Sequence, residues 1–186
     1  ADSKEIENTV NFLIGKKQNN FELLHCVSCY PPKAKDLNLN NIINFKNKFN
    51  VPIGYSDHFS EKSSAVTAVS LGANIIEKHI TLDNKMKGPD HLASLEPNIF
   101  KEMVKCIRNI EISLGDGIKK PSTSEIKNLG IVRKSLVAKK YIKKGELFSE
   151  ENLTTKRPGT GMDPMLWNKI IGTLSSKDFE PDEVIY

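Results

Sequence analysis

No stretch of the 186-residue sequence approaches the roughly 20 apolar residues that a membrane-spanning helix requires. The first residues are polar and contain no apolar segment of the kind that a cleavable signal needs. Cysteine is scarce, and an odd total of three without a secretion signal is typical of a reducing compartment. We therefore expect a cytoplasmic protein with no membrane partner.

Several functional classes lack their sequence signature. The net charge is only +4 and the lysines are spread along the chain, so no basic stripe indicates a nucleic-acid partner. Neither G-x-G-x-x-G nor a Walker A loop is present, which leaves nucleotide chemistry without support. Cys26 and Cys29 form a C-x-x-C, but zinc would need a second pair and a thioredoxin-type pair would open a helix. A function for this pair is therefore not favoured.

The first two-thirds of the chain alternate between helical and strand-like patterns. Short apolar runs at residues 21–26, 51–55 and 74–80 predict strands, and apolar spacing predicts helices at 6–14, 39–49 and 65–71. The clearest helix carries an apolar stripe from Phe100 to Leu114 and ends at Gly115. Strand followed by helix three times predicts an α/β fold with a parallel sheet.

The pattern changes after this helix. Residues 115–124 are rich in glycine, proline and serine, and short strand-like pieces follow at 135–138 and 146–148. We therefore predict a βα region at 1–118, a linker at 119–133 and a small β-rich domain at 134–186. Three βα units are too few for an eight-stranded barrel of about 250 residues, so they form either an open sheet or part of a barrel.

Each predicted strand ends in polar residues, at the edge where parallel sheets hold their ligands. His58 and His79 lie at equivalent ends of successive strands, close enough to share a divalent cation such as Mn, Fe, Co or Zn. Ser56 offers a hydroxyl to a phosphate or carboxylate, unless it only stabilises a turn, and Lys78 adds charge. His25 alone is expected to be structural.

His91 lies in the loop after the third predicted strand. The sequence leaves it open as a third ligand, a substrate contact or a surface residue.

Five stretches, in this order along the chain, resemble the sialic acid synthase family. They are residues 51–58 (VPIGYSDH), 76–79 (IEKH), 88–91 with 94–97 (GPDH and SLEP), 114–117 (LGDG) and 156–161 (KRPGTG). The resemblance implies the C-terminal part of a (β/α)8 TIM barrel, comprising its last three βα units. It also implies a following antifreeze-like SAF domain of the β-clip type, and a homodimer in which each SAF domain covers the partner's barrel.

The resemblance also implies a site by position. Carried over to this chain, the metal ligands are His58 and His79, the phosphoenolpyruvate contact is Ser56, and the sugar contacts are Tyr30, Asp90 and, from the other subunit's small domain, Arg157. The metal implied is Mn²⁺, with Mg²⁺ or Co²⁺ as alternatives. Ser28 departs from an asparagine that some relatives place among the phosphoenolpyruvate contacts, so its role stays open.

The reaction implied joins phosphoenolpyruvate to N-acetylmannosamine and gives N-acetylneuraminate and phosphate. The family's catalytic glutamate, and the lysines that hold phosphoenolpyruvate, belong to earlier barrel strands. No catalytic residue is therefore assigned in this chain, which is predicted to be inactive alone. The alternatives are a legionaminic or pseudaminic acid synthase, which uses a related acetamido sugar, and a non-catalytic sugar-binding module.

Overall fold

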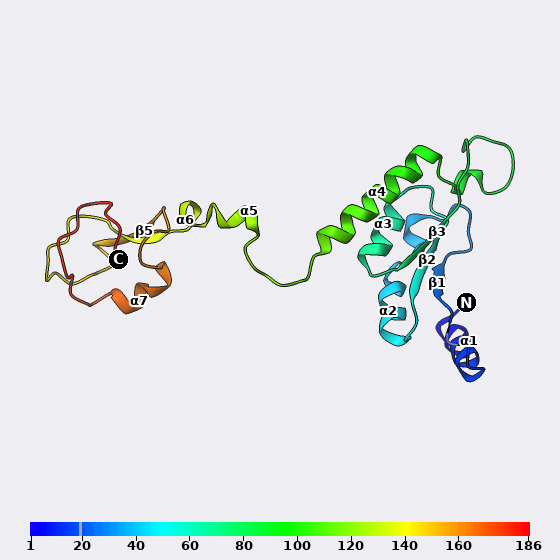
Figure 1. The fold of residues 1–186 in the computed structure, drawn as a ribbon, viewed down its shortest axis with the longest axis horizontal. Helices are drawn as coiled ribbons and strands as arrows, with labels where there is room; N and C mark the ends of the chain where they lie inside the picture. The colour runs from blue at the N-terminus through cyan, green and yellow to red at the C-terminus, as the bar shows by residue number, and fades with distance from the viewer. Residues whose placement is uncertain (19) are drawn as a thin grey trace. The chain divides into compact units, whose positions relative to one another are not determined.

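The computed structural model describes residues 1–18 and 20–186. The chain divides into two compact units, Ala1–Ile118 and Lys119–Tyr186 (Figure 1). Among the described residues, no helix combines the length and the apolar character needed to cross a membrane.

The first unit contains a sheet of three parallel strands in the order β1-β2-β3. The strands are β1 (Leu23–Cys26), β2 (Ile53–Asp57) and β3 (Ile75–Lys78). The helices are α1 (Ser3–Gly15), α2 (Asn40–Lys48), α3 (Ser63–Ser70) and α4 (Pro97–Leu114), with 3-10 turns η1 (Ala34–Asp36) and η2 (His91–Ala93). The alternation of strand and helix predicted from the sequence is confirmed. The described strands form an open sheet, which by itself is no closed barrel.

Local chemistry explains where helix α1 begins and where helix α4 ends. The Asp2 side chain accepts hydrogen bonds from the backbone N–H groups of Lys4 and Glu5, and the Glu5 carboxylate in turn accepts one from the backbone N–H of Asp2. This reciprocal capping box satisfies N–H groups that have no partner within the helix. Helix α4 ends at Gly115, whose φ of 59° is accessible to glycine at little cost.

The core of the first unit lies on the side of the sheet that faces the helices. Ile53 and Tyr55 of β2 pack against Ile42 and Phe45 of α2, while a second cluster joins α3 to Met103 of α4. Because side chains alternate along a strand, the residues between these core positions project from the opposite face. Ser56 of β2 and Glu77 of β3 occupy that opposite face as register partners.

His25 is structural, as predicted. It is buried, its Nε2 lies 2.8 Å from the carbonyl oxygen of Leu37, and its ring stacks on Tyr55 at 5.9 Å between centroids. A buried imidazole with a backbone partner and an aromatic neighbour needs no ligand to explain it.

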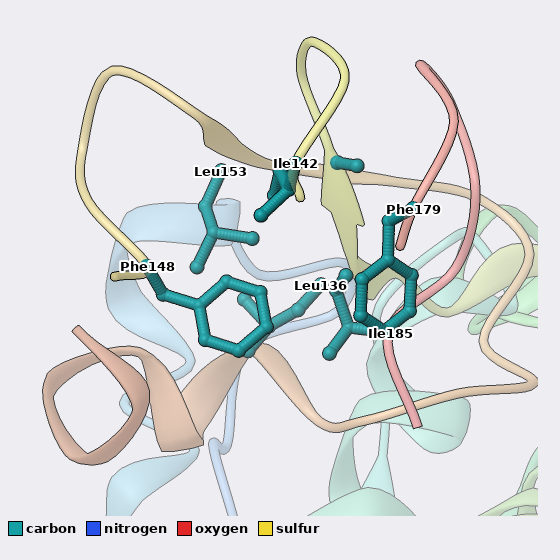
Figure 2. Packing of buried hydrophobic residues seen from close by; sticks show 7 residues of the cluster. Leu136, Ile142, Phe148, Leu153, Phe179 and Ile185 are labelled. Atoms are coloured by element: carbon teal, nitrogen blue, oxygen red, sulfur yellow. The ribbon is translucent and has the colours of Figure 1, made fainter. Parts of the chain in front are cut away.

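The second unit has one antiparallel pair, β4 (Ser135–Ala138) with β5 (Leu153–Lys156). Short helices α5 (Thr123–Ile126), α6 (Leu129–Val132) and α7 (Trp167–Ile170) and the 3-10 turn η3 (Pro164–Leu166) complete it. Figure 2 shows its separate core, formed by Leu136, Ile142, Phe148, Leu153, Phe179 and Ile185.

The predicted strand at 146–148 is wrong, because the structure has only an isolated bridge there, between Leu147 and Leu174. A turn at Gly145 precedes the bridge, and a second turn, which the side chain of Asn152 closes, follows it. Asn152 Nδ2 donates to the carbonyl of Leu147, and its Oδ1 accepts from the N–H of Ser149. These side-chain bonds close a turn immediately after the bridge. Backbone hydrogen bonds between residues 145–148 and 172–175 flank the bridge.

Candidate metal centre

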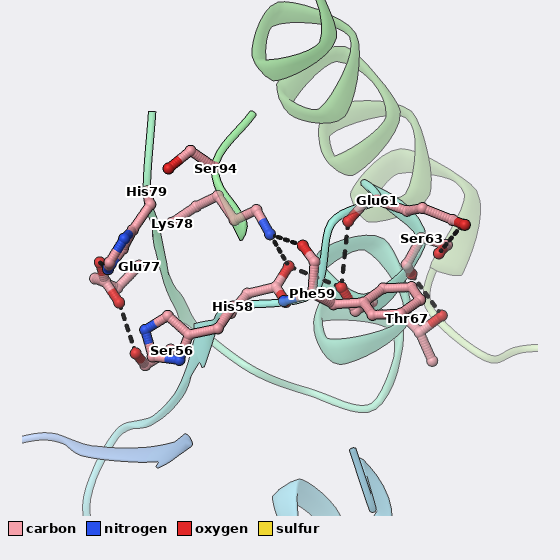
Figure 3. Close-up of polar contacts among 12 residues, drawn as sticks. Ser56, His58, Phe59, Glu61, Ser63, Thr67, Glu77, Lys78, His79 and Ser94 are labelled. Atoms are coloured by element: carbon pink, nitrogen blue, oxygen red, sulfur yellow. Dashed lines mark hydrogen bonds and ion pairs between the residues drawn. The ribbon is translucent and has the colours of Figure 1, made fainter. Parts of the chain in front are cut away.

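The candidate centre lies at the edge of the sheet where β2 and β3 end (Figure 3). His58 follows β2, His79 follows β3, and Glu77 is the penultimate residue of β3. Nitrogen atoms of the two imidazoles and an oxygen of the carboxylate all lie within 4.8 Å of one another. The two imidazole rings are 4.9 Å apart between centroids and nearly perpendicular, at 86°. Parallel strands thus bring residues 21 positions apart to one point, as the sequence predicts for the two histidines.

His58 is held in a defined orientation by the loop after β1. It is buried, and its Nδ1 lies 3.2 Å from the carbonyl oxygen of Val27. A carbonyl can only accept, so Nδ1 is the donor wherever this contact is a hydrogen bond, and Nε2 is then the nitrogen that could bind a metal. Cys26 Sγ also lies 3.8 Å from Nδ1. The same carbonyl accepts from the N–H of Cys29 at 2.8 Å, which fixes its direction. A histidine ligand whose other nitrogen donates to a backbone carbonyl is the usual arrangement in metal sites.

Glu77 was not predicted as a site residue, although it lies at the centre of this cluster. Its Oε2 accepts a 2.6 Å hydrogen bond from Ser56 Oγ, and its Oε1 is 4.0 Å from His79 Nε2. The signal that could have found it is strand periodicity. Glu77 precedes His79 by two positions, so both project from one face of β3.

The two predicted sugar contacts on the first unit lie beside the histidines. The ring of Tyr30 is 4.1 Å from that of His58 and 6.0 Å from that of His79, between centroids. Asp90 Oδ2 is 3.9 Å from His79 Nδ1, which is within ion-pair range if the imidazole is protonated. Tyr30 and Asp90 are both substantially exposed, so each can reach a ligand.

Lys78 does not add charge to this cluster as the sequence analysis expects. Alternation along β3 turns it to the helix-facing side, where its buried Nζ lies 3.3 Å from Asp57 Oδ2. Burial lowers the pKa of Lys78, and the neighbouring Asp57 carboxylate opposes that change. The positive charge is therefore matched within the protein.

The remaining candidates have partners elsewhere. His91 Nδ1 lies 2.8 Å from Thr81 Oγ1 in the loop after β3, so His91 stabilises that loop. Arg157 belongs to the second unit, where its Nε donates to the carbonyl of Val132 at 3.0 Å. The His91 bond stays within the loop after β3, and the Arg157 bond stays within the second unit.

A parallel α/β sheet with two histidines and a glutamate at its carboxyl edge defines an α/β protein with a candidate divalent-metal centre. The chain belongs to the NeuB family, which matches residues 1–119, and residues 133–186 match the SAF domain. The resemblance to the sialic acid synthase family is therefore confirmed.

Two relatives illustrate what the chain is similar to. It is 50% identical over 187 residues to an N,N'-diacetyllegionaminic acid synthase of Campylobacter jejuni, covering 100% of this chain and 56% of that protein. It is 43% identical over 169 residues to a pseudaminic acid synthase of the same species, covering 90% and 49%. The chain thus spans about half the length of the curated relatives it matches.

A solved structure gives the same result for the fold. The N-acetylneuraminic acid synthetase of Leptospira borgpetersenii, crystallised with citrate, matches with a TM-score of 0.63 and 41% identity. The match covers 69% of this chain and 45% of that one.

Proposed function

We propose that this chain is the C-terminal part of a metal-dependent sugar-acid synthase that condenses phosphoenolpyruvate with an acetamido sugar and releases phosphate. The observation that carries the proposal is the convergence of His58, Glu77 and His79 at the carboxyl edge of a parallel sheet. A non-catalytic sugar-binding module, the alternative from another class, has no use for this cluster.

The donor set fits a divalent cation. The contact of His58 Nδ1 with the carbonyl of Val27 leaves Nε2 as the nitrogen that could bind the cation. Two imidazoles with one carboxylate form a mixed nitrogen and oxygen set that suits divalent transition metals such as Mn, Fe or Co. The family resemblance favours Mn²⁺ among the candidates, with Mg²⁺ or Co²⁺ as alternatives. A cation bound there would act as a Lewis acid that polarises the aldehyde of the open-chain sugar.

Ser56 is positioned to change partners when substrate binds. Its hydroxyl has one hydrogen, which it donates to Glu77. If Ser56 donates instead to the phosphate of phosphoenolpyruvate, the Glu77 carboxylate is released to bind the cation or to accept a proton. The 2.6 Å contact therefore couples phosphoenolpyruvate binding to the availability of Glu77.

Tyr30, Asp90 and Arg157 would bind and orient the sugar. The Asp90 carboxylate can accept hydrogen bonds from sugar hydroxyls, and Tyr30 offers an aromatic face next to His58. We propose that Arg157 comes from the SAF domain of the second subunit in a swapped homodimer. Its guanidinium stays charged, so it acts through binding and orientation and not through proton transfer.

Two sugars are candidates for the second substrate. N-acetylmannosamine is the one that the resemblance implies, and its diacetamido deoxy analogue is favoured by the relative that is 50% identical along the whole chain. We expect the analogue to give the higher kcat/KM, by a factor on the order of a hundred or more, because a site that hydrogen-bonds a second acetamide leaves polar groups unpaired without it.

Competition between the two sugars, with phosphoenolpyruvate and Mn²⁺, measures this ratio directly. It should be done on the full-length protein, by which we mean this chain together with the N-terminal half that the family resemblance implies. A higher kcat/KM for N-acetylmannosamine would assign the protein to N-acetylneuraminate synthesis instead. Turnover of neither sugar would contradict both assignments.

A further inference from the structure

A buried ion pair lies directly behind the candidate metal centre. Asp57 and Lys78 are register partners on β2 and β3, and each immediately precedes one of the two histidines. Their charged atoms are 3.3 Å apart, and their side chains are 0% and 1% exposed. In Figure 3 the Lys78 side chain extends away from Glu77 and His79, towards the segment of Phe59. The pair therefore joins the two strands on the face opposite the histidines.

The pair also holds the chain on both sides of His58. Asp57 Oδ1 accepts from the N–H of Phe59 at 3.0 Å, and Lys78 Nζ donates to the carbonyl of the same residue. Asp57 Oδ2 accepts a 2.7 Å hydrogen bond from Ser64, which belongs to α3. The residue before His58 and the residue after it are thus tied to β3 and to α3.

We propose that Asp57 and Lys78 are positioning residues that set the separation of His58 and His79 for metal binding, an inference that rests on the proposed metal-dependent function. A buried ion pair is weak evidence for stability, because the cost of desolvating two charges offsets most of their attraction. What the pair supplies here is geometry. It fixes the relative position of two strand ends at the residues that adjoin the ligands.

The direction of the effect on metal affinity separates positioning from simple charge effects. Removing Lys78 takes a positive charge away from the vicinity of a cation site, so electrostatics alone predict tighter Mn²⁺ binding. Loss of positioning predicts weaker binding, by about tenfold or more, as for other residues that orient metal ligands. The double variant Asp57→Asn/Lys78→Met removes both charges, so it changes no net charge and leaves no buried charge unpaired.

The test is a Mn²⁺ titration, followed by electron paramagnetic resonance, of the full-length parent, Lys78→Met and the double variant, with thermal unfolding measured in parallel. A matched control is Lys62→Met/Glu102→Gln, which removes an exposed ion pair of 2.5 Å. Lys62 immediately precedes α3, and Glu102 belongs to α4. We expect the double variant to fold like the parent but to bind Mn²⁺ about tenfold more weakly, with the control unchanged.

Two outcomes overturn the inference, and they can be told apart. A folded double variant that binds Mn²⁺ as tightly as the parent contradicts the positioning role and leaves the proposed function standing. A parent that binds no Mn²⁺ contradicts the metal-dependent function, and the positioning role falls with it. If Lys78→Met fails to fold because Asp57 is left unpaired, the double variant still decides.

Discussion

Replacing His58 or His79 by alanine is expected to weaken Mn²⁺ binding by on the order of a hundredfold or more, and to reduce product formation to a similar extent. Each substitution removes one of two imidazoles from a cluster whose donor atoms lie within 4.8 Å of one another. Residues that merely orient a ligand already affect metal affinity by about 10- to 100-fold, so loss of a ligand itself should cost at least as much. Mn²⁺ titration of the full-length protein and its variants measures the effect.

His91→Ala is the matched control, because it removes the same side chain from the same unit. The His91 imidazole contacts Thr81 and does not belong to the cluster. Circular dichroism would show whether each variant stays folded, which matters for the buried His58. Equal Mn²⁺ affinity in the parent, His58→Ala and His79→Ala would place the metal elsewhere. Absence of binding in the parent would favour the sugar-binding module.

Arg157→Ala is expected to lower kcat/KM for the sugar by about a hundredfold while Mn²⁺ affinity stays unchanged. A hydrogen bond from a charged group contributes about 1.5–3 kcal/mol, and each 1.4 kcal/mol corresponds to about tenfold. Lys156→Ala is the control, since Lys156 is the adjacent cation and pairs with Asp182. Steady-state kinetics with the sugar as the varied substrate measures the loss. An unchanged kcat/KM in Arg157→Ala would remove this residue from the site.

Mixed dimers test whether Arg157 acts across subunits. One subunit would carry His58→Ala and the other Arg157→Ala, each strongly impaired as a homodimer. If the SAF domains are swapped, one site of the mixed dimer contains both lesions and the other contains neither, so activity returns to about half that of the parent. If Arg157 serves its own subunit, both sites are damaged and the mixed dimer stays as impaired as the two homodimers.

Much of the fold follows from residue periodicity. The short apolar runs of the first unit correctly predicted its three parallel strands, and the apolar stripe from Phe100 to Leu114 correctly predicted α4. Both patterns are readable because each element buries apolar side chains at regular spacing. The segment predicted as a strand at 146–148 has only an isolated bridge to Leu174, and it is followed by a turn, closed by the Asn152 side chain, that no periodicity reveals.

The site could be predicted only in part. Two histidines after successive strands indicate a shared edge, and the structure brings His58 and His79 together there. Strand alternation along β3 predicts that Glu77 lies on the same face of the sheet as His79 and that Lys78 lies on the opposite face. The sequence analysis did not apply this rule to β3. The position of Tyr30 could not be derived in this way, since it depends on the path of a loop between β1 and α2.

Mn²⁺-dependent product formation from phosphoenolpyruvate and an acetamido sugar tests the central claim most directly. It should be measured on this chain alone and on the full-length protein, with N-acetylmannosamine and its diacetamido analogue as substrates. We expect a sugar acid and phosphate in equal amounts from the full-length protein, only with a divalent metal, and no product from the chain alone. Turnover by the chain alone at a rate like that of the full-length protein, or turnover that persists without metal, would contradict it.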